Sequence, residues 1–224
     1  MSSASLIYKH PFLYELIMSV LYGRHYRARY ESLADLIPSG ASVLDLCCGP
    51  AVLYRRYLSR KFVTYKGLDV SDAFVAFLRK NGVNSQAWDL RSSTPLPTAE
   101  FVLMQASLYH FLPNPAPVVH RMLESATKAV IISEPIRNLV SDERSMLSSV
   151  AKWATNPGYE PETLRFTEES LDAFMRRNFS NIENVFIIEG GREKVYVLNC
   201  LNKQSKQKIS SDSSVLKPSP DFGF

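Results

Sequence analysis

Hydrophobic residues near the start of the chain recur at the spacing of an amphipathic helix. Tyr14, Ile17, Met18 and Leu21 fall at positions i, i+3, i+4 and i+7, and a second set with this spacing occupies positions 30–37. A Pro-Ser-Gly sequence at 38–40 ends the second set. The pattern therefore predicts two helices, which together form a helical cap segment over residues 1–38.

From residue 42 onwards, short continuous apolar runs alternate with helical patterns. Helices are expected over 52–60, after an N-cap at Ser71, and from Pro117 to Ala126. The apolar runs, which we expect to be strands, cover residues 42–46, 62–70, 83–88, 101–105 and 129–133. Such an alternation is typical of a parallel sheet covered by helices on both faces. The sequence thus predicts a doubly wound, mainly parallel α/β fold.

The last part of the chain has a different pattern. Thr167 is expected to cap a helix, and two further strand-like runs, 182–189 and 193–201, flank Gly190-Gly191. Two such runs around a pair of glycines indicate a hairpin. We therefore expect seven strands, the last two forming an antiparallel hairpin at the edge of the sheet.

The segments outside these patterns set the expected domain organisation. The core domain should cover residues 39–202. A stretch at about 135–166 is too long for a simple connection and is expected to be a helical insertion that caps the sheet. Residues 203–224 are rich in Ser, Lys and Pro, which predicts a disordered tail.

Composition narrows the functional classes. The net charge is +4, and the tail carries half of it, so the body lacks the concentrated basic face that nucleic-acid binding normally requires. No apolar run approaches the roughly 20 residues that span a bilayer. Three cysteines make no disulfide framework. We expect a cytoplasmic protein with no membrane partner, and the charge disfavours nucleic acid as a partner.

The turn after the first strand-like run carries the first candidate chemistry. Residues 43–53 read VLDLCCGPAVL, with Cys47 and Cys48 directly before Gly49-Pro50. In an open parallel sheet, ligands bind beyond the carboxyl ends of the strands. The glycine patterns of dinucleotide-binding turns and P-loops are absent. Adjacent cysteines point to opposite sides of an extended chain and lack C-x-x-C spacing, so we predict no metal or redox site; a plain turn with a buried cysteine stays an alternative.

Three acids end three successive strand-like runs. Asp69 follows Asp45 by 24 residues, a placement that suits a carboxylate binding the two hydroxyls of a ribose. Asp89 is placed to accept a hydrogen bond from an exocyclic amine such as that of adenine, and Asp45 to hold an ammonium group or a water network. Together the three acids predict a binding site for a positively charged nucleoside.

With these motifs the sequence resembles the class I S-adenosylmethionine-dependent methyltransferases over about residues 40–135. VLDLCCGPA resembles the family's first motif, VLDLGCGxG; GLDVS, AWDL and PLPTAEFVLMQASLYHF resemble the regions at the ends of the next three strands. The resemblance implies a Rossmann-like methyltransferase fold with seven strands and S-adenosyl-L-methionine as the cofactor. It implies cofactor contacts from Asp45, Cys47, Gly49, Pro50, Asp69, Val70, Asp89, Leu90 and Gln105.

The chain departs from the family pattern at a few positions. Cys47 and Ala51 stand where the family usually has glycine; both are small, but they lose the φ freedom of glycine. Glu100 replaces a common Asp, and a usual Lys-Pro-Gly-Gly turn before the fifth strand is missing. Within the resemblance, Cys47 and Cys48 fill a turn where the backbone approaches the methionine part of the cofactor.

The resemblance also locates the expected chemistry at the end of the fourth strand. His110 is the best candidate for a general base because its usual pKa is near neutrality, although it is equally a residue that could only hydrogen-bond the following loop. Tyr109 is expected either to orient the substrate or to pack, and Glu134 either to contact substrate or to begin a helix. From the N-terminal helices, Tyr22, Tyr26 and Arg27 are expected to close on the methionine carboxylate, with plain core packing as the alternative.

We expect from this a methyltransferase that acts on a small-molecule acceptor. Two other classes stay open: a nucleic-acid or protein methyltransferase, and a non-catalytic protein that binds S-adenosylmethionine as a sensor or assembly partner. The sequence predicts neither the acceptor nor the oligomeric state.

Overall fold

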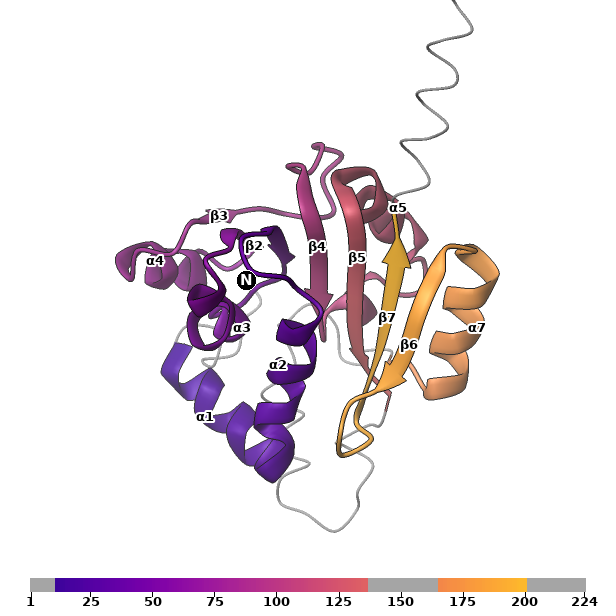
Figure 1. Ribbon diagram of the computed structural model, residues 1–224, viewed down its shortest axis with the longest axis horizontal. Coiled ribbons are helices and arrows are strands. Elements are labelled where there is room, and N and C mark those ends of the chain that lie inside the picture. The colour runs from indigo at the N-terminus through magenta and orange to yellow at the C-terminus, as the bar shows by residue number, and fades with distance from the viewer. Residues whose placement is uncertain (1–10, 137–164, 201–224) are drawn as a thin grey trace, which may run out of the picture.

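The computed structural model describes residues 11–136 and 165–200, which form one seven-stranded sheet with helices on both faces (Figure 1). The strand order is β3-β2-β1-β4-β5-β7-β6. Strands β1 to β5 run parallel, and β7 is antiparallel to both β5 and β6. The strands are β1 (Ser42–Leu46), β2 (Thr64–Asp69), β3 (Ser85–Ala87), β4 (Ala99–Gln105), β5 (Ala126–Pro135), β6 (Ile182–Ile187) and β7 (Glu193–Asn199). The predicted fold class, including the C-terminal hairpin, is confirmed.

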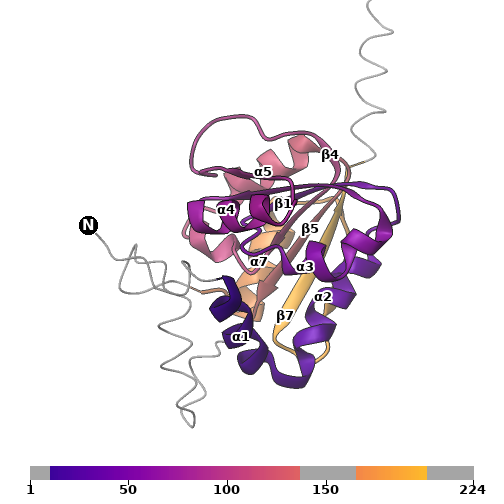
Figure 2. The same ribbon diagram turned by 90° about the vertical axis from the view of Figure 1, so that its left-hand side faces the viewer.

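The helices form two layers. Figure 2 shows α2 and α3 on one side of the sheet and α5 and α7 on the other, and the buried residues of α1 pack with the layer of α2 and α3. The α-helices are α1 (Pro11–Tyr22), α2 (Tyr26–Asp35), α3 (Val52–Arg56), α4 (Asp72–Lys80), α5 (Ala116–Ser125) and α7 (Glu168–Asn178). Among the described helices, none is long and apolar enough to cross a membrane.

Alternation along the central strands fills both layers of the core. Successive side chains of a strand point to opposite faces, so Val43 packs with the layer of α1 to α3 and Leu44 with the layer of α5 and α7. In the same way, Ile131 and Ile132 of β5 enter opposite layers. The central strands are therefore apolar on both faces, which explains their continuous hydrophobic runs.

Two helix starts follow the predicted capping chemistry. The Phe74 N–H donates to Ser71 Oγ at 3.4 Å and begins α4. At α7, the Ser170 N–H donates to Thr167 Oγ1 at 3.2 Å, and the Thr167 N–H donates to Ser170 Oγ at 2.9 Å. These bonds satisfy N–H groups that a helix start leaves without an intrahelical partner.

Several predicted boundaries are wrong by a few residues. The helix expected over 52–60 ends at Arg56 and is followed by a 3₁₀ turn, Leu58–Lys61. Phe62 has a left-handed φ of 56° and an 87% exposed side chain, so β2 starts only at Thr64. The strand expected over 83–88 shrinks to β3, which lies at the sheet edge and has a single neighbour. Ala126, expected on a helix face, is extended and starts β5.

The expected insertion at 135–166 lies outside the described residues, except for its two ends. Pro135 is the last residue of β5, and Phe166 is buried just before α7. The tail expected at 203–224 also lies outside the described residues.

Candidate functional site

The carboxyl ends of β1, β2, β4 and β5 bring most of the predicted site residues together. Asp45 pairs in register with Gly67 of β2 and Leu103 of β4, and Gln105 pairs with Ser133 of β5. The chain order reverses between β1 and β4. Ligands of open α/β sheets bind at this switch point, beyond the carboxyl ends of the strands. The parallel register therefore places the candidate site at this edge.

The turn after β1 has an unusual backbone. Cys47, Gly49 and Ala51 have φ values of 54°, 53° and 50°, all in the left-handed region. Asp69 fastens this turn to the end of β2, because its Oδ2 accepts the Gly49 N–H at 2.8 Å and its Oδ1 accepts the Ser71 N–H at 2.8 Å. Cys47 and Ala51 thus adopt the conformation that glycine favours, at a cost of roughly 1–2 kcal/mol each.

The two cysteines face opposite layers, as predicted. Cys47 packs with the layer of α5 and α7, and Cys48 with the layer of α1 to α3. A Cβ on Gly67 would lie 2.8 Å from Cys48 Sγ, so the thiol fills the space beside this glycine. Burial raises the pKa of both thiols, and the carboxylates of Asp45 and Asp69 raise it further. Both thiols are therefore protonated at neutral pH and are poor nucleophiles.

Two buried carboxyl groups flank the turn. Asp45 accepts a hydrogen bond from the Tyr65 hydroxyl at 2.8 Å, and burial raises the pKa of Asp45 to about 7. Burial also raises the pKa of Asp69, opposed by the Ser71 and Gly49 N–H groups. Within the described chain, neither group has a cationic side chain at ion-pair distance, and no cluster of His, Cys, Asp and Glu is arranged to hold a metal. Carboxyl groups buried in this way favour a ligand with positive charge.

Glu134 has a structural contact that the sequence did not reveal. Its Oε2 accepts the Leu108 N–H at 2.9 Å, and its Oε1 accepts the Tyr109 N–H at 3.4 Å. Burial raises the pKa of Glu134 to about 8. The carboxyl group thus holds the 3₁₀ turn Leu108–Phe111, which carries Tyr109 and His110.

Tyr109 and His110 form an aromatic pair beside a cation. Their ring centroids are 4.0 Å apart, and the Arg165 guanidinium carbon lies 3.4 Å from the Tyr109 centroid. Burial lowers the pKa of His110 to about 4, helped by the charges of Arg165 and Arg91. His110 is therefore neutral at pH 7 but a weak base. Sequence reasoning missed Arg165 because it lies in the stretch assigned as a whole to the cap.

A buried polar network joins the N-terminal helices to the sheet. Glu193, at the start of β7, is 1% exposed and accepts hydrogen bonds from Tyr22 Oη at 2.5 Å and Arg29 Nε at 2.5 Å. Its Oε2 accepts from Ser133 Oγ at 2.9 Å and from Gln105 Nε2 at 3.4 Å. The network thus brings together two predicted cofactor-binding residues, Tyr22 and Gln105. Both side chains donate their hydrogen bonds to Glu193.

Arg29 and Glu193 were not among the predicted site residues. The sequence signal for Glu193 is a single acid at the start of an apolar run that is otherwise suited to a central strand. Tyr14 was assigned only to a packing stripe. In the structure its ring contacts Phe74 edge-on at 5.7 Å; burial raises its pKa, Arg29 opposes this, and Asp69 and Glu193 raise it further. Tyr14 therefore lies over the candidate site.

The other predicted residues are more scattered. Tyr26 is buried against Tyr30, with ring centroids 5.2 Å apart. Arg27 lies on the exposed face of α2, where it pairs with Glu31 at 3.1 Å, and does not join the group. Four further residues lie near the ends of β1, β2 and β3: Pro50 and Leu90 are buried, Val70 is 62% exposed, and Asp89 is exposed and accepts the Arg91 N–H at 2.8 Å.

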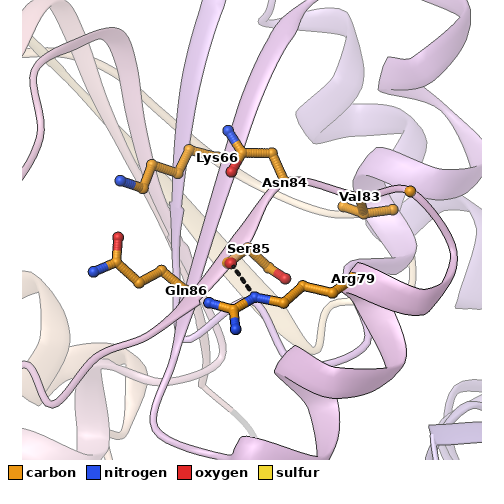
Figure 3. Close-up of a pocket in the computed structure, with 7 residues that line it drawn as sticks. Lys66, Arg79, Val83, Asn84, Ser85 and Gln86 are labelled. Atoms are coloured by element: carbon orange, nitrogen blue, oxygen red, sulfur yellow. Dashed lines mark hydrogen bonds between the residues drawn. The ribbon is translucent and has the colours of Figure 1, made fainter.

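A separate hollow of about 570 Å³ lies beside the start of β3 (Figure 3). Its lining includes Lys66, Asn84 and Gln86, and Arg79 Nε donates to the Ser85 carbonyl oxygen at 3.0 Å. Lys66 lies three residues before Asp69, about 10 Å along the strand. None of the predicted site residues lines this hollow.

With the geometry established, comparison with known proteins identifies the family. The sequence model of the family described as "Methionine biosynthesis protein MetW" matches residues 27–139, just over half of the chain. The chain belongs to this family. Its fold is that of class I S-adenosylmethionine-dependent methyltransferases. The match spans β1 to β5 and hence Asp45, Asp69, Gln105 and Glu134, but it ends before Arg165 and Glu193.

Among curated relatives, the MetW-family chain is similar to trans-aconitate 2-methyltransferase of Mycobacterium tuberculosis (strain ATCC 25177 / H37Ra). The two are 26% identical over 176 residues, which cover 68% of this chain and 66% of the relative. The chain thus spans slightly less than two thirds of that protein. The trans-aconitate 2-methyltransferase of Mycobacterium ulcerans (strain Agy99) is 37% identical over 76 residues, 33% of this chain and 28% of the relative.

Solved structures share the fold of the MetW-family chain. A SAM-dependent methyltransferase from Aquifex aeolicus superposes with a TM-score of 0.55 at 16% identity, covering 83% of this chain and 98% of that one. Magnesium protoporphyrin IX methyltransferase from Synechocystis PCC 6803, with bound SAH, gives a TM-score of 0.57 at 14% identity, with coverages of 82% and 92%. These likenesses support the fold assignment.

Proposed function

We propose that this MetW-family protein transfers the methyl group of S-adenosyl-L-methionine to a small-molecule acceptor. The observation that carries the proposal is the pair of buried carboxyl groups, Asp45 and Asp69, on either side of the left-handed turn 47–51. Neither has a cationic partner within the described chain, so a cationic cofactor fits there.

Each residue has a proposed role toward the cofactor. Asp69 binds the ribose hydroxyls while it holds the Gly49 N–H, since a carboxylate has about four acceptor sites. Asp45 holds the ammonium group, and Asp89 accepts from the adenine amine. The side chain of Cys47 is small enough to let the backbone approach the methionine part. The proposed cofactor-facing set also includes Gly49, Pro50, Val70, Leu90, Gln105, Tyr22 and Tyr26.

The bound cofactor supplies a methyl group that is activated by a positively charged sulfur. The protein must then align the acceptor with this methyl group and exclude water. Tyr109, His110 and Glu134 are the proposed residues on the acceptor side. Of these, Glu134 acts through the backbone of the 3₁₀ turn that it holds.

A small-molecule acceptor is supported by two observations. The curated relatives are named for trans-aconitate, a small tricarboxylate. The chain's net charge of +4 lies half in residues 203–224, which leaves a body with little excess positive charge for nucleic acid. The three free thiols fit a reducing compartment, so we place the reaction in the cytoplasm.

Isothermal titration with S-adenosylmethionine tests the proposal. Asp69→Ala should weaken binding by about 10-fold to 100-fold, because a hydrogen bond to a charged group contributes about 1.5–3 kcal/mol. Asp72→Ala is the matched control: it removes an exposed acid three residues away, in the first turn of α4. Equal affinity for the wild type and Asp69→Ala would contradict the ribose assignment, and absence of wild-type binding would contradict the function.

A further inference from the structure

The acceptor side of the candidate site lacks a strong base among the described residues. Burial lowers the pKa of His110 to about 4 and raises the pKa of the Tyr109 phenol. Glu134 is 1% exposed, and its carboxyl group holds the backbone N–H groups of the 3₁₀ turn. A side chain that removes a proton from an alcohol or an amine works best with a pKa near the working pH and within reach of the substrate. None of these three groups combines the two.

The same side carries a cation without an acidic partner in the described chain. The central guanidinium carbon of Arg165 lies over the Tyr109 ring, 3.4 Å from its centroid. No carboxylate of the described residues lies within 4.0 Å of it. Nearby acids of α7 are engaged elsewhere, because Glu168 and Asp172 both pair with Lys194.

The contact with Tyr109 leaves part of the guanidinium for a ligand. An arginine has five N–H donors, and the contact with the ring, together with a hydrogen bond to the phenol, occupies only some of them. The remaining N–H groups match the two oxygens of a carboxylate in a bidentate pair. Tyr109 is itself held by the Glu134 contact to its backbone N–H, so the platform under Arg165 is fixed.

We propose that the methyl acceptor is a carboxylic acid, bound by Arg165 and methylated on a carboxylate oxygen. The inference rests on the proposed function and names its substrate class. An ionised carboxylate oxygen attacks the methyl carbon; the O–C bond forms as the C–S bond breaks, and S-adenosylhomocysteine leaves as a neutral thioether. The methylated carboxylate becomes an uncharged ester group. No proton is transferred, so the reaction needs no general base.

The test follows radiolabelled methyl from S-adenosylmethionine into trans-aconitate, citrate, itaconate and succinate, with catechol and ethanolamine as acceptors of other classes. Methyl esters release methanol in mild alkali, whereas methyl ethers and N-methyl amines do not. The wild type should produce base-labile label from at least one of the acids.

Variants assign the recognition to Arg165. Arg165→Met should raise KM for the acid by about 10-fold to 100-fold, the loss expected for a charge-assisted hydrogen bond, and leave the affinity for S-adenosylmethionine unchanged. Arg165→Lys should retain part of the affinity, because it keeps the charge but loses the bidentate geometry. Arg177→Met removes an exposed charge at the far end of α7 and should change neither value.

The outcomes separate the inference from the function on which it rests. Base-stable label, an unchanged KM in Arg165→Met, or a protein that binds S-adenosylmethionine but methylates none of the acids would overturn the carboxylate assignment. A wild-type protein that does not bind S-adenosylmethionine would overturn the proposed function itself, and the inference with it.

Discussion

Cys47 shows how much a single backbone angle decides at this site. Its φ of 54° is one that a cysteine adopts at a cost and a glycine adopts freely. Cys48, its neighbour, is not among the residues with positive φ, and its thiol fills the space beside Gly67. Replacement of each cysteine by glycine should therefore have different effects on stability: it relieves backbone strain at position 47 and removes a packed side chain at position 48.

We predict that Cys47→Gly leaves the free energy of unfolding within about 1 kcal/mol of the wild type or raises it. The relief of left-handed strain offsets the added freedom of the unfolded chain, about 0.4–1 kcal/mol. Cys48→Gly should lower it by about 1–2 kcal/mol, since it loses packing and gains only unfolded-state freedom. Urea unfolding of both variants provides the measurement. Equal losses at the two positions would show that φ does not matter at Cys47.

Asp45 should make stability depend on pH. Its pKa rises from an ordinary value of 3.8 to about 7 in the fold, so between these values the folded state holds a proton that the unfolded chain has released. The contribution of Asp45 to stability is therefore fully present below about pH 4 and is lost as the pH rises through 7. Glu134, with a pKa of about 8, acts in the same direction. His110, with a pKa lowered to about 4, acts in the opposite direction below pH 6.5.

Asp45→Asn isolates the contribution of Asp45 to this pH dependence, because asparagine can still accept a hydrogen bond from the Tyr65 hydroxyl but does not titrate. We predict that the free energy of unfolding falls more steeply from pH 5 to pH 8 in the wild type than in Asp45→Asn. Urea unfolding at pH 5, 6.5 and 8 measures the free energy of unfolding of both proteins. The contributions of the other titrating groups cancel in the difference between them. Parallel pH profiles would mean that Asp45 is ionised throughout.

At the scale of residues, the sequence pointed to the acids at the strand ends but did not point to Arg165 or Glu193. Asp45, Asp69 and the turn 47–51 were found because strand ends and small residues leave a local pattern in the sequence. Arg165 and Glu193 were missed because each contributes through residues far away in the chain, such as Tyr109 and Arg29. No local spacing encodes such contacts.

At the scale of elements, helix α2 takes part in two ion pairs that differ strongly in their exposure to solvent. Arg29 and Glu193 are 3% and 1% exposed and connect α2 to β7. Arg27 and Glu31 are 79% and 43% exposed and lie one turn apart on α2. Removing one partner of a buried pair leaves an uncompensated buried charge, whereas an exposed pair is screened by water.

We predict that Arg29→Met lowers the free energy of unfolding by about 3–5 kcal/mol and that the double variant Arg29→Met/Glu193→Leu recovers much of this loss. Arg27→Met, the control on the same helix, should change it by less than about 0.5 kcal/mol. Chemical unfolding of the three variants and the wild type gives the comparison. A double variant as unstable as the sum of its single losses would argue that the charges stabilise the fold outright.

The prediction of elements was best where a strand is central. Strand β1 matches its predicted range 42–46 because both its neighbours are parallel strands and its side chains fill both layers. Strand β3 lies at the edge and keeps only Ser85–Ala87 of the range 83–88. The break after Arg56 was missed because Tyr57 and Phe62 depart from helical backbone geometry at residue types that normally tolerate a helix.

At the scale of the whole molecule, α1 packs on the core with one side only. It exposes Phe12, Leu16 and Val20 by 80%, 50% and 57%, on one stripe of the helix. Its inner side carries Tyr14 towards Phe74 and the Asp69 carboxylate. A helix with few buried contacts opens locally at lower free energy than the sheet does. If the cofactor lies on Asp69, it lies against this inner side and gives α1 additional contacts.

We therefore predict that S-adenosylmethionine slows amide hydrogen exchange in α1 (Pro11–Tyr22) by on the order of 10-fold or more. Exchange in α7 (Glu168–Asn178), on the other face of the sheet, should slow less, because we expect no cofactor contact there. A ligand that only stabilised the fold as a whole would instead slow every globally exchanging amide equally. Hydrogen exchange followed by mass spectrometry, with and without saturating cofactor, measures both helices in one experiment. Asp69→Ala at the same cofactor concentration is the control, and its α1 protection should fall with its affinity. Uniform slowing across the chain would mean that α1 does not contact the cofactor.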